Sequence, residues 1–319
     1  MCMVEESHRE FLDMIESRFS KLRQKLTDAL ERNQARAILV SGGIDSGILA
    51  YLSPGVKGVT VNLNGKGEDL KYVTILRDSI DLDVTIVKVG VDEALSAVKK
   101  VVKILRSFDP ALPNDLAVYF GMREAKRQGL GSIMTGDGGD ELFGGYSYMQ
   151  EIEDLDGYIR RISRFMSFSS HRIGKDFGLE VRQPYLDEDF IEFALSLGSD
   201  VKIKEEKGKI WGKWALRKAF EPFLPPEFIW QGKRPLEVGS GMALLRRVIA
   251  ERIPDEEFDE KKRVYPVRFL CKEHLHFYEI YRQEVGEIPQ PGEGEDRCPG
   301  CGGGVPHGKR HCKICGWVE

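Results

Sequence analysis

Two glycine-rich segments of this chain carry acidic and hydroxyl side chains at spacings that suit phosphate chemistry. The first, Ser41 to Ser46 (SGGIDS), directly follows the apolar run Ala37 to Val40. Its two glycines let the backbone curl so that successive amide groups can converge on an anion. The helical pattern from Gly47 to Leu52 would place a positive helix end at the same spot. With Asp45 for a divalent cation and the Ser46 hydroxyl for a phosphate oxygen, the segment predicts a pyrophosphate-binding turn.

This turn differs from the two common glycine motifs of nucleotide-binding proteins. No Gly-Lys-Ser/Thr ending occurs in the chain, and Gly47 is wrongly spaced for Gly-x-Gly-x-x-Gly. An ATPase that cleaves the γ-phosphate and a dinucleotide-binding oxidoreductase are therefore both disfavoured. For the six residues taken alone, an ordinary tight turn stays open as an alternative.

The second segment, Thr135 to Tyr146, packs three acidic residues and five glycines into twelve positions after a predicted strand. Carboxylates this close repel one another unless a cation or a protonated partner lies among them. Asp140 together with Asp45 could hold Mg²⁺ against phosphates, because hard oxygen ligands suit that ion. The alternatives are a calcium-like acidic loop and a plain surface turn.

Four of the six cysteines form two Cys-x-x-Cys pairs within the last 22 residues: Cys298, Cys301, Cys312 and Cys315. In a reducing compartment this grouping indicates a metal rather than disulfides. The spacing suits tetrahedral Zn²⁺ in a small ribbon, and four sulfur ligands leave no open position for catalysis. Iron in a rubredoxin-like setting is the alternative. His307 and His311 are expected to be surface residues, since the cysteines already complete the shell.

Strand-like and helical segments alternate through the first half of the chain. The strand-like runs are Ala37 to Val40, Gly58 to Leu63, Val84 to Val89 and Ser132 to Thr135, with helical patterns such as Asp69 to Ser79 and Asp92 to Leu105 between them. This alternation predicts a doubly wound parallel α/β sheet. Ligands of such sheets bind beyond the carboxyl ends of the strands. Ser41 and Gly136 are therefore expected to face one pocket.

The remaining segments predict four regions. Residues 1–33 form an amphipathic helix expected to pack on the sheet, and residues 34–283 form the main domain. The pattern from about Tyr146 to Gly286 predicts a helical lobe over the sheet, with Asp189 to Leu197 and Ile210 to Phe220 as its clearest helices. Residues 284–296 predict an exposed linker, and residues 297–319 the zinc ribbon.

The composition and net charge of the chain limit the classes of molecule that it is expected to bind. The chain has 319 residues, 41% of them hydrophobic, and a formal net charge of −4. Such a chain can bury a full core, but it has no overall basic field, so contact with nucleic acid would have to be local. No apolar run approaches the roughly 18 residues of a membrane helix, and the N-terminus lacks a signal-peptide layout. A cytoplasmic protein with no membrane partner is expected.

Four segments in a fixed order carry a resemblance to a known family. The segments Ser41 to Ser46, Gly136 to Tyr146 and Gly178 to Asp187 resemble three signatures of the synthetase domain of asparagine synthetase, in the N-type ATP pyrophosphatase (PP-loop) group. A fourth, Trp230 to Gly241, resembles the loop of the family's catalytic lysine. The resemblance covers roughly residues 33–241 and implies an adenine nucleotide α-hydrolase-like fold.

The resemblance also implies roles for single residues. The positions that match the family's ATP-binding residues are Val40, Ser41, Gly42, Gly43, Asp45, Ser46, Val61, Thr135 and Gly136. The magnesium positions are Asp45 and Asp140. Matches to catalytic residues fall on Lys233, which would meet the charge on the α-phosphate, and on Asp137 and Glu180. Arg182 and Asp187 match positions near the acid substrate. Asp137 is one methylene shorter than the family's usual Glu.

The implied activity is that of an ATP-dependent amide ligase. A carboxylate, with aspartate favoured, would attack the α-phosphorus of ATP to give an acyl-adenylate and pyrophosphate, and an amine or ammonia would then attack the activated carbonyl. ATP, Mg²⁺ and a structural Zn²⁺ are the expected cofactors. The family's glutaminase domain has a cysteine nucleophile, but only 44 residues precede Asp45, so Cys2 is expected to be an incidental thiol. Ammonia would be free or come from a separate glutaminase subunit.

A PP-loop enzyme that adenylates a tRNA base is the alternative. The predicted ribbon is locally basic and could contact RNA through Arg297, Lys309, Arg310 and Lys313. The catalytic cysteines expected of such an enzyme are missing, since the main domain offers only Cys271.

Overall fold

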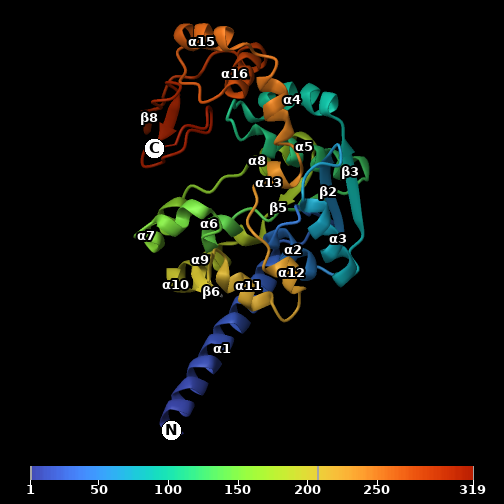
Figure 1. Cartoon of the computed structure of the whole chain (residues 1–319), viewed down its shortest axis with the longest axis vertical. Coiled ribbons are helices and arrows are strands. Elements are labelled where there is room, and N and C mark those ends of the chain that lie inside the picture. The colour runs from blue at the N-terminus through green and yellow to red at the C-terminus, as the bar shows by residue number, and fades with distance from the viewer. Residues whose placement is uncertain (1, 207, 319) are drawn as a thin grey trace.

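A five-stranded parallel sheet lies at the centre of the protein (Figure 1). The structure is a computed structural model that describes residues 2–206 and 208–318, with residues 2–16 as backbone alone. The strands run in the order β3-β2-β1-β4-β5. Their bounds are β1 Ala37–Leu39, β2 Lys57–Leu63, β3 Val84–Val89, β4 Ser132–Met134 and β5 Glu180–Arg182. The predicted α/β class with a parallel sheet is confirmed.

Both faces of the sheet are covered, as a doubly wound fold requires. Ala37 belongs to a buried cluster that includes α4 (Val91–Leu105) and α5 (Leu112–Arg127). The next residue, Ile38, belongs to a second cluster with α2 (Ile44–Tyr51) and α3 (Asp69–Ile80). Successive side chains of a strand point to opposite faces of the sheet, so the residues of β1 contribute to two separate hydrophobic cores.

Two segments differ from their predicted form. Glu180–Arg182 is the edge strand β5, pairing with β4 through Ser132 and Glu180. The predicted helix over 210–220 begins late: Lys209–Trp211 is strand β7, antiparallel to β6 (Lys204–Glu206), and α11 covers Trp214–Phe220. The chain turns between them, where Lys213 adopts a left-handed φ of 55°.

The rest of the main domain is helical, as the predicted lobe requires. Its helices are α6 Gly139–Phe143, α7 Leu155–Ser163, α8 Ser169–Asp176, α9 Glu188–Ser196, α10 Ser199–Lys202, α12 Pro226–Ile229, α13 Leu236–Gly239, α14 Leu244–Ala250, α15 Asp255–Val264 and α16 Lys272–Glu284, with 3₁₀ turns at Ser147–Glu151 and Pro184–Leu186.

The helix α1 (Cys2–Arg32) extends from one end of the molecule (Figure 1). Its last turns pack chiefly on α11 rather than directly on the sheet: the Phe19 and Trp214 rings are 5.7 Å apart, and Arg23 donates to the carbonyl of Ala219. The side chain of Cys2 lies outside the described part of the chain. Among described residues, no helix has the length and apolar character needed to cross a membrane.

The C-terminal segment forms a small hairpin, with β8 (Glu295–Arg297) antiparallel to β9 (Gly304–Pro306). Its four cysteines are buried and belong to the same apolar cluster as α4, α5 and α16. Figure 1 shows this segment at the same end of the molecule as α16. It shares a core with the main domain rather than hanging from it.

Candidate active site

The two glycine-rich loops meet where the strand order of the sheet reverses. From β1 the chain continues to β2 and β3 on one side, whereas β4 and β5 lie on the other. A crevice at such a switch point is the usual ligand site of a doubly wound sheet. Ser41 follows β1 and Gly136 follows β4, and both line one cavity of about 460 Å³.

The Ser41 to Ser46 turn is held by its own hydroxyl groups and by close packing. The Ser46 hydroxyl accepts a hydrogen bond from the Ser41 amide and donates one to the Gly43 carbonyl, each at 3.2 Å. Gly42 has a φ of 68°, and a Cβ there would lie 2.9 Å from the carbonyl oxygen of Asp69. A side chain at Gly42 would therefore strain the turn. The arrangement leaves the N-terminal amides of α2 at the cavity.

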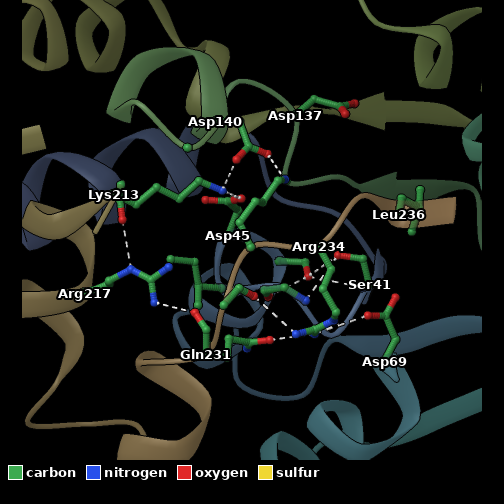
Figure 2. Close-up of a pocket in the computed structure, with 18 of the residues that line it drawn as sticks. Ser41, Asp45, Asp69, Asp137, Asp140, Lys213, Arg217, Gln231, Arg234 and Leu236 are labelled. Atoms are coloured by element: carbon green, nitrogen blue, oxygen red, sulfur yellow. Dashed lines mark hydrogen bonds and ion pairs between the residues drawn. The ribbon is translucent and has the colours of Figure 1, made fainter. Parts of the chain in front are cut away.

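A buried lysine joins the two loops through their carboxylates (Figure 2). Lys213 Nζ bonds Asp45 Oδ2 and lies 2.6 Å from Asp140 Oδ1. Lys233 Nζ lies 2.6 Å from the other oxygen, Asp140 Oδ2. The Lys213 side chain is 4% exposed, whereas that of Lys233 is 35% exposed. Two carboxylates and two ammonium groups thus form one network at the floor of the cavity.

The network fixes the charges of its members. Burial raises the pKa of Asp45. Burial acts the same way on Asp140, but Lys213 and Lys233 outweigh it and lower the pKa of Asp140 to about 2. Burial opposes the charge on Lys213, yet Asp140 and Asp45 raise its pKa above the ordinary value. Asp140 and Lys213 are therefore charged at neutral pH.

The two carboxylates suit a hard divalent cation. Asp45 Oδ1 is buried and has no hydrogen-bond partner among the described residues. A Cβ at Gly139 would lie 2.4 Å from that oxygen, so the carboxylate occupies space that the glycine leaves free. A Cβ at Gly145 would overlap Asp140 Oδ1 in the same way. Unpartnered carboxylate oxygen is the ligand type that Mg²⁺ prefers.

A second polar group lies beside the turn. Arg234 Nη2 donates to Gln231 Oε1 at 2.7 Å and lies 3.5 Å from Asp69 Oδ1. Burial raises the pKa of Asp69 to about 7, although Arg234 opposes this. Arg217 donates to the Gln231 carbonyl at 3.0 Å and to the Gly212 carbonyl at 2.9 Å. Arg217 thereby anchors the segment that carries Lys233 and Arg234.

Asp137 lies apart from these groups and has uncharged partners (Figure 2). Its Oδ2 accepts from Thr135 Oγ1 at 2.6 Å, Ser170 Oγ at 2.5 Å and Gln183 Nε2 at 2.8 Å. No hydrogen bond from a described side chain is present at Oδ1. This oxygen is therefore available to a molecule in the cavity, which Asp137 and Ser170 both line.

Most of the residues predicted from the sequence lie around the cavity. Those that line it are Ser41, Gly43, Asp45, Ser46, Thr135, Gly136, Asp137, Asp140 and Lys233. Gly42 shapes the turn from behind, whereas Val40 and Val61 are buried and lie outside the lining. The apolar residues of the lining include Leu39, Val118 and Leu236.

Three further predicted residues, from the Gly178 to Asp187 segment, also lie outside the lining of the cavity. Glu180 pairs with Arg182 at 2.6 Å on the edge strand β5. Asp187 caps α9 by accepting from the Phe190 amide, and it accepts two hydrogen bonds from Arg32 of α1. The Arg32 hydrogen bonds lower the pKa of Asp187. These contacts give Asp187 a part in holding α1 and α9 together.

Sequence reasoning missed several residues of the cavity: Asp69, Ser170, Lys213, Arg217, Gln231 and Arg234. A signal existed for two of them. Lys213 and Arg217 are four positions apart at the start of a largely apolar helix, and two cations on the buried face of a helix need anionic or carbonyl partners. Gln231 and Arg234 lie in the Trp230 to Gly241 segment already singled out, but they were given no role, and Asp69 and Ser170 carry no such pattern.

The C-terminal cysteines form a second chemical centre. Their four Sγ atoms lie within 4.8 Å of one another. The Cys298–Cys315 and Cys301–Cys312 Sγ atoms are 3.6 Å and 3.8 Å apart. Those separations are too long for disulfides, and they match the edge of about 3.8 Å that a tetrahedron with Zn–S bonds of about 2.3 Å would have.

The two histidines of the hairpin have carboxylate partners instead of a place in this cluster. His307 Nδ1 lies 2.9 Å from Asp296 Oδ2, and His311 Nε2 lies 3.2 Å from Asp109 Oδ2. The donor set is therefore four cysteines, which fits a structural metal.

In comparison with known proteins, one family model matches most of the chain. The model for asparagine synthase matches residues 20–177 and 160–283. The probable glutamine-hydrolysing asparagine synthetase of Dictyostelium discoideum is 27% identical over 298 residues, covering 82% of this chain and 53% of the relative. Asparagine synthetase B of Escherichia coli K12 is 24% identical, covering 86% and 55%. The chain thus spans about half the length of these relatives.

One solved structure gives a weak overall match. It is the U34-tRNA thiolase NcsA from Methanococcus maripaludis with its [4Fe-4S] cluster, with 13% identity and a TM-score of 0.32, covering 94% of this chain and 87% of that one. A similarity at this level has no bearing on function.

Proposed function

The chain belongs to the asparagine synthase family, and from this premise we propose that it is an ATP-dependent amide ligase that releases AMP and pyrophosphate. The observation that carries the proposal is the meeting of two loops over one cavity. Asp45 and Asp140, one from each loop, share Lys213 there, and Lys233 contacts Asp140 from the rim. Such a concentration of fixed charge suits a polyanion and its metal.

ATP would lie along the turn after β1. Its phosphates would accept hydrogen bonds from the amides at the start of α2 and from the hydroxyls of Ser41 and Ser46. The apolar lining from Leu39, Val118 and Leu236 suits the adenine ring. Val40, Val61, Thr135 and Gly136 would shape this part of the cavity. Asp45 and Asp140 would hold Mg²⁺, which neutralises phosphate charge when bound.

Lys233 would act on the α-phosphate. A carboxylate oxygen of the acid forms a bond to the α-phosphorus, the bond to the bridging oxygen breaks, and pyrophosphate leaves with the electron pair. Lys233 is partly exposed at the rim, so its ammonium group can turn from Asp140 toward the charge that builds up in this step. Electrostatic help that grows in the transition state raises the rate.

Asp137 would serve the second step. An amine or ammonia attacks the acyl carbon, the bond to AMP breaks, and the nitrogen loses a proton. Asp137 Oδ1 is the proposed acceptor for that proton, since its other oxygen already has three donors. A positioned carboxylate is suited to this role. Glu180, Arg182 and Asp187 would act from outside the cavity, through the edge of the sheet and α9.

We propose aspartate as the acid and ammonia or another amine as the nitrogen donor. The names of the relatives state that they hydrolyse glutamine. We propose that ammonia is either free or supplied by a separate glutaminase subunit. The cysteine centre would hold a structural Zn²⁺, since four thiolates leave no position for a substrate.

The test is to identify the products of turnover. The protein is incubated with ATP, Mg²⁺, ammonia and a panel of carboxylic acids, and AMP, ADP, pyrophosphate and orthophosphate are separated. Acid-dependent release of AMP and pyrophosphate, with formation of an amide, is the expected result. ADP and orthophosphate as the products would refute the proposal. Pyrophosphate release that requires tRNA instead of a small acid would favour an RNA-modifying enzyme.

A further inference from the structure

The second cysteine pair of the ribbon encloses two residues, Lys313 and Ile314, that contact the main domain. The Ile314 carbonyl accepts hydrogen bonds from the Phe108 amide at 2.7 Å and from Ser107 Oγ at 3.1 Å. Phe108 is fully buried in the shared core. The loop between the two cysteines is thus fastened to the segment that leads into α5.

Lys313 makes a second attachment on the other side of that loop. Its Nζ donates to the Ser167 carbonyl at 3.0 Å. Ser167 lies two positions before α8, and the second residue of α8 is Ser170, whose hydroxyl donates to Asp137 Oδ2. Only two residues, 168 and 169, therefore separate the contact with the ribbon from a hydrogen bond to the cavity carboxylate.

A third contact secures the same region. Asp109 pairs with His311 of the ribbon and accepts from the Ala111 amide just before α5. A Cβ at Gly316 would lie 2.4 Å from Asp109 Oδ1, so the ribbon approaches closely there. Helix α5 carries Val118, which lines the cavity. The ribbon therefore contacts two segments, residues 107–111 and 167–170, that continue into the wall of the cavity.

We propose that Lys313 is a positioning residue for Asp137, and that the metal-loaded ribbon holds Ser170 and Asp137 in place on the acceptor side of the cavity. The part played by Asp137 in turnover rests on the proposed function, but the mechanical link does not. A metal at the four cysteines fixes the backbone between Cys312 and Cys315, because metal sites of this kind order the loops that carry their ligands. Without the metal, the backbone that positions the Ile314 carbonyl and the Lys313 side chain is no longer held in place.

The link predicts an effect on one side of the cavity. The Asp45–Lys213–Asp140 network has no partner in the ribbon among the contacts of the described residues, so ATP binding should not depend on Lys313. Asp137 depends on Ser170 for one of its hydrogen bonds, so the apparent KM for the acid or the amine should depend on Lys313. The loss of one hydrogen bond of this kind corresponds to an effect of about three- to tenfold.

Hydrogen exchange of the full chain tests the link without any assay of activity. Lys313→Met should speed amide exchange in residues 165–176, while exchange in residues 41–52 stays as in the unchanged protein. Lys313→Arg keeps a donor and should restore slow exchange. Lys309→Met removes another lysine of the same ribbon and serves as the matched control. Unchanged exchange in residues 165–176 of the Lys313→Met variant would overturn the proposal.

Metal removal and kinetics complete the test. The metal is removed with a chelator, and the metal left in the protein is measured. Its removal should speed amide exchange in residues 105–111 and 165–176 together. Protection retained in both segments after metal loss would count against the link. Ser170→Ala should raise the KM for the acid or amine about three- to tenfold, with the Kd for ATP unchanged and with exchange in residues 105–111 unaltered. If no pyrophosphate is released by any variant, the proposed function fails, and the exchange results still decide the link.

Discussion

The two sides of the cavity hold their carboxylates by different means. On the nucleotide side, Asp45 and Asp140 are held by the ammonium groups of Lys213 and Lys233. On the other side, Asp137 is held by two hydroxyls and an amide. The first arrangement balances charge with charge inside the protein. The second gives a carboxylate a fixed direction while leaving its charge unbalanced.

Because of this difference, we expect substitutions on the nucleotide side to change mainly stability and substitutions on the Asp137 side to change mainly selectivity. Removal of one member of a buried ion pair leaves an uncompensated charge and costs several kcal/mol, so the nucleotide side is expected to tolerate little change. A hydrogen bond from one uncharged donor to a carboxylate contributes about 1.5 kcal/mol, so the Asp137 side can change partners at lower cost. Under the proposed function, the specificity for the acceptor can therefore vary on that side while ATP use stays the same.

Lys213→Met should have the largest effect. It leaves Asp45 and Asp140 buried without the ammonium group that joins them, and the expected loss in free energy of unfolding is about 3–5 kcal/mol at neutral pH. Urea denaturation measures it. Lys209→Met is the matched control, because Lys209 also lines the cavity but lies over the Trp211 ring. A loss below about 1 kcal/mol for Lys213→Met would show that the two sides do not differ.

Lys233→Met should affect turnover rather than stability. If Lys233 meets the charge on the α-phosphate, pyrophosphate release should fall about 100-fold, or about 3 kcal/mol in activation free energy, with little change in the free energy of unfolding. Lys71→Met is the control, since each lysine lies 5.3 Å from a tyrosine ring, Tyr146 for Lys233 and Tyr72 for Lys71. Equal rates in the two variants would remove Lys233 from the mechanism.

Asp69 should make the nucleotide side sensitive to pH. Burial raises its pKa from the ordinary 3.8 to about 7 in the folded protein. The folded state therefore keeps a proton that the unfolded chain has already released, and stability falls as pH rises from about 4 to about 7. Asp69→Asn lacks this loss, so its stability relative to the unchanged protein should increase by about 2 kcal/mol between about pH 5 and pH 8.

Denaturation curves at several pH values measure this gain. Asp78→Asn removes an exposed carboxylate from the same helix and serves as the control. A difference between the Asp69→Asn variant and the unchanged protein that stays constant with pH would contradict a buried, titrating Asp69.

Ser170→Ala should have the smallest effect. It removes one of three uncharged donors to the Asp137 carboxylate, so the expected change in free energy of unfolding is about 1.5 kcal/mol. Calorimetric or urea denaturation would detect it. A destabilisation as large as that of Lys213→Met would mean that the Asp137 side is as rigid as the nucleotide side, and the contrast between the two would be lost.

Local sequence patterns were enough for the sheet and for one half of the site. The run from Val84 to Val89 is a strand over its full predicted length. The glycine spacing of the Ser41 to Ser46 and Thr135 to Tyr146 segments indicated two loops after strands, and both line the cavity. Patterns of this kind are read from neighbouring residues, so a single sequence contains them.

The opposite case is the stretch from Lys209 to Lys213. Its apolar residues fit a helical period, but the hairpin β6–β7 and the turn at Lys213 replace the first part of that helix. Gly212 fits there because a Cβ would lie 2.2 Å from the Gly144 carbonyl oxygen. That approach comes from a segment nearly 70 positions away in the chain, so no local pattern contains it.

The sequence by itself determined the parallel α/β sheet, the position of the phosphate-type turn and the four cysteines of the ribbon, since each depends on residues close together in the chain. Tertiary structure alone decided that Lys213 joins Asp45 to Asp140, that Asp187 pairs with α1 outside the cavity, and that Lys313 contacts the segment leading to Ser170. The physical reason is that burial and charge pairing depend on which distant segments pack together.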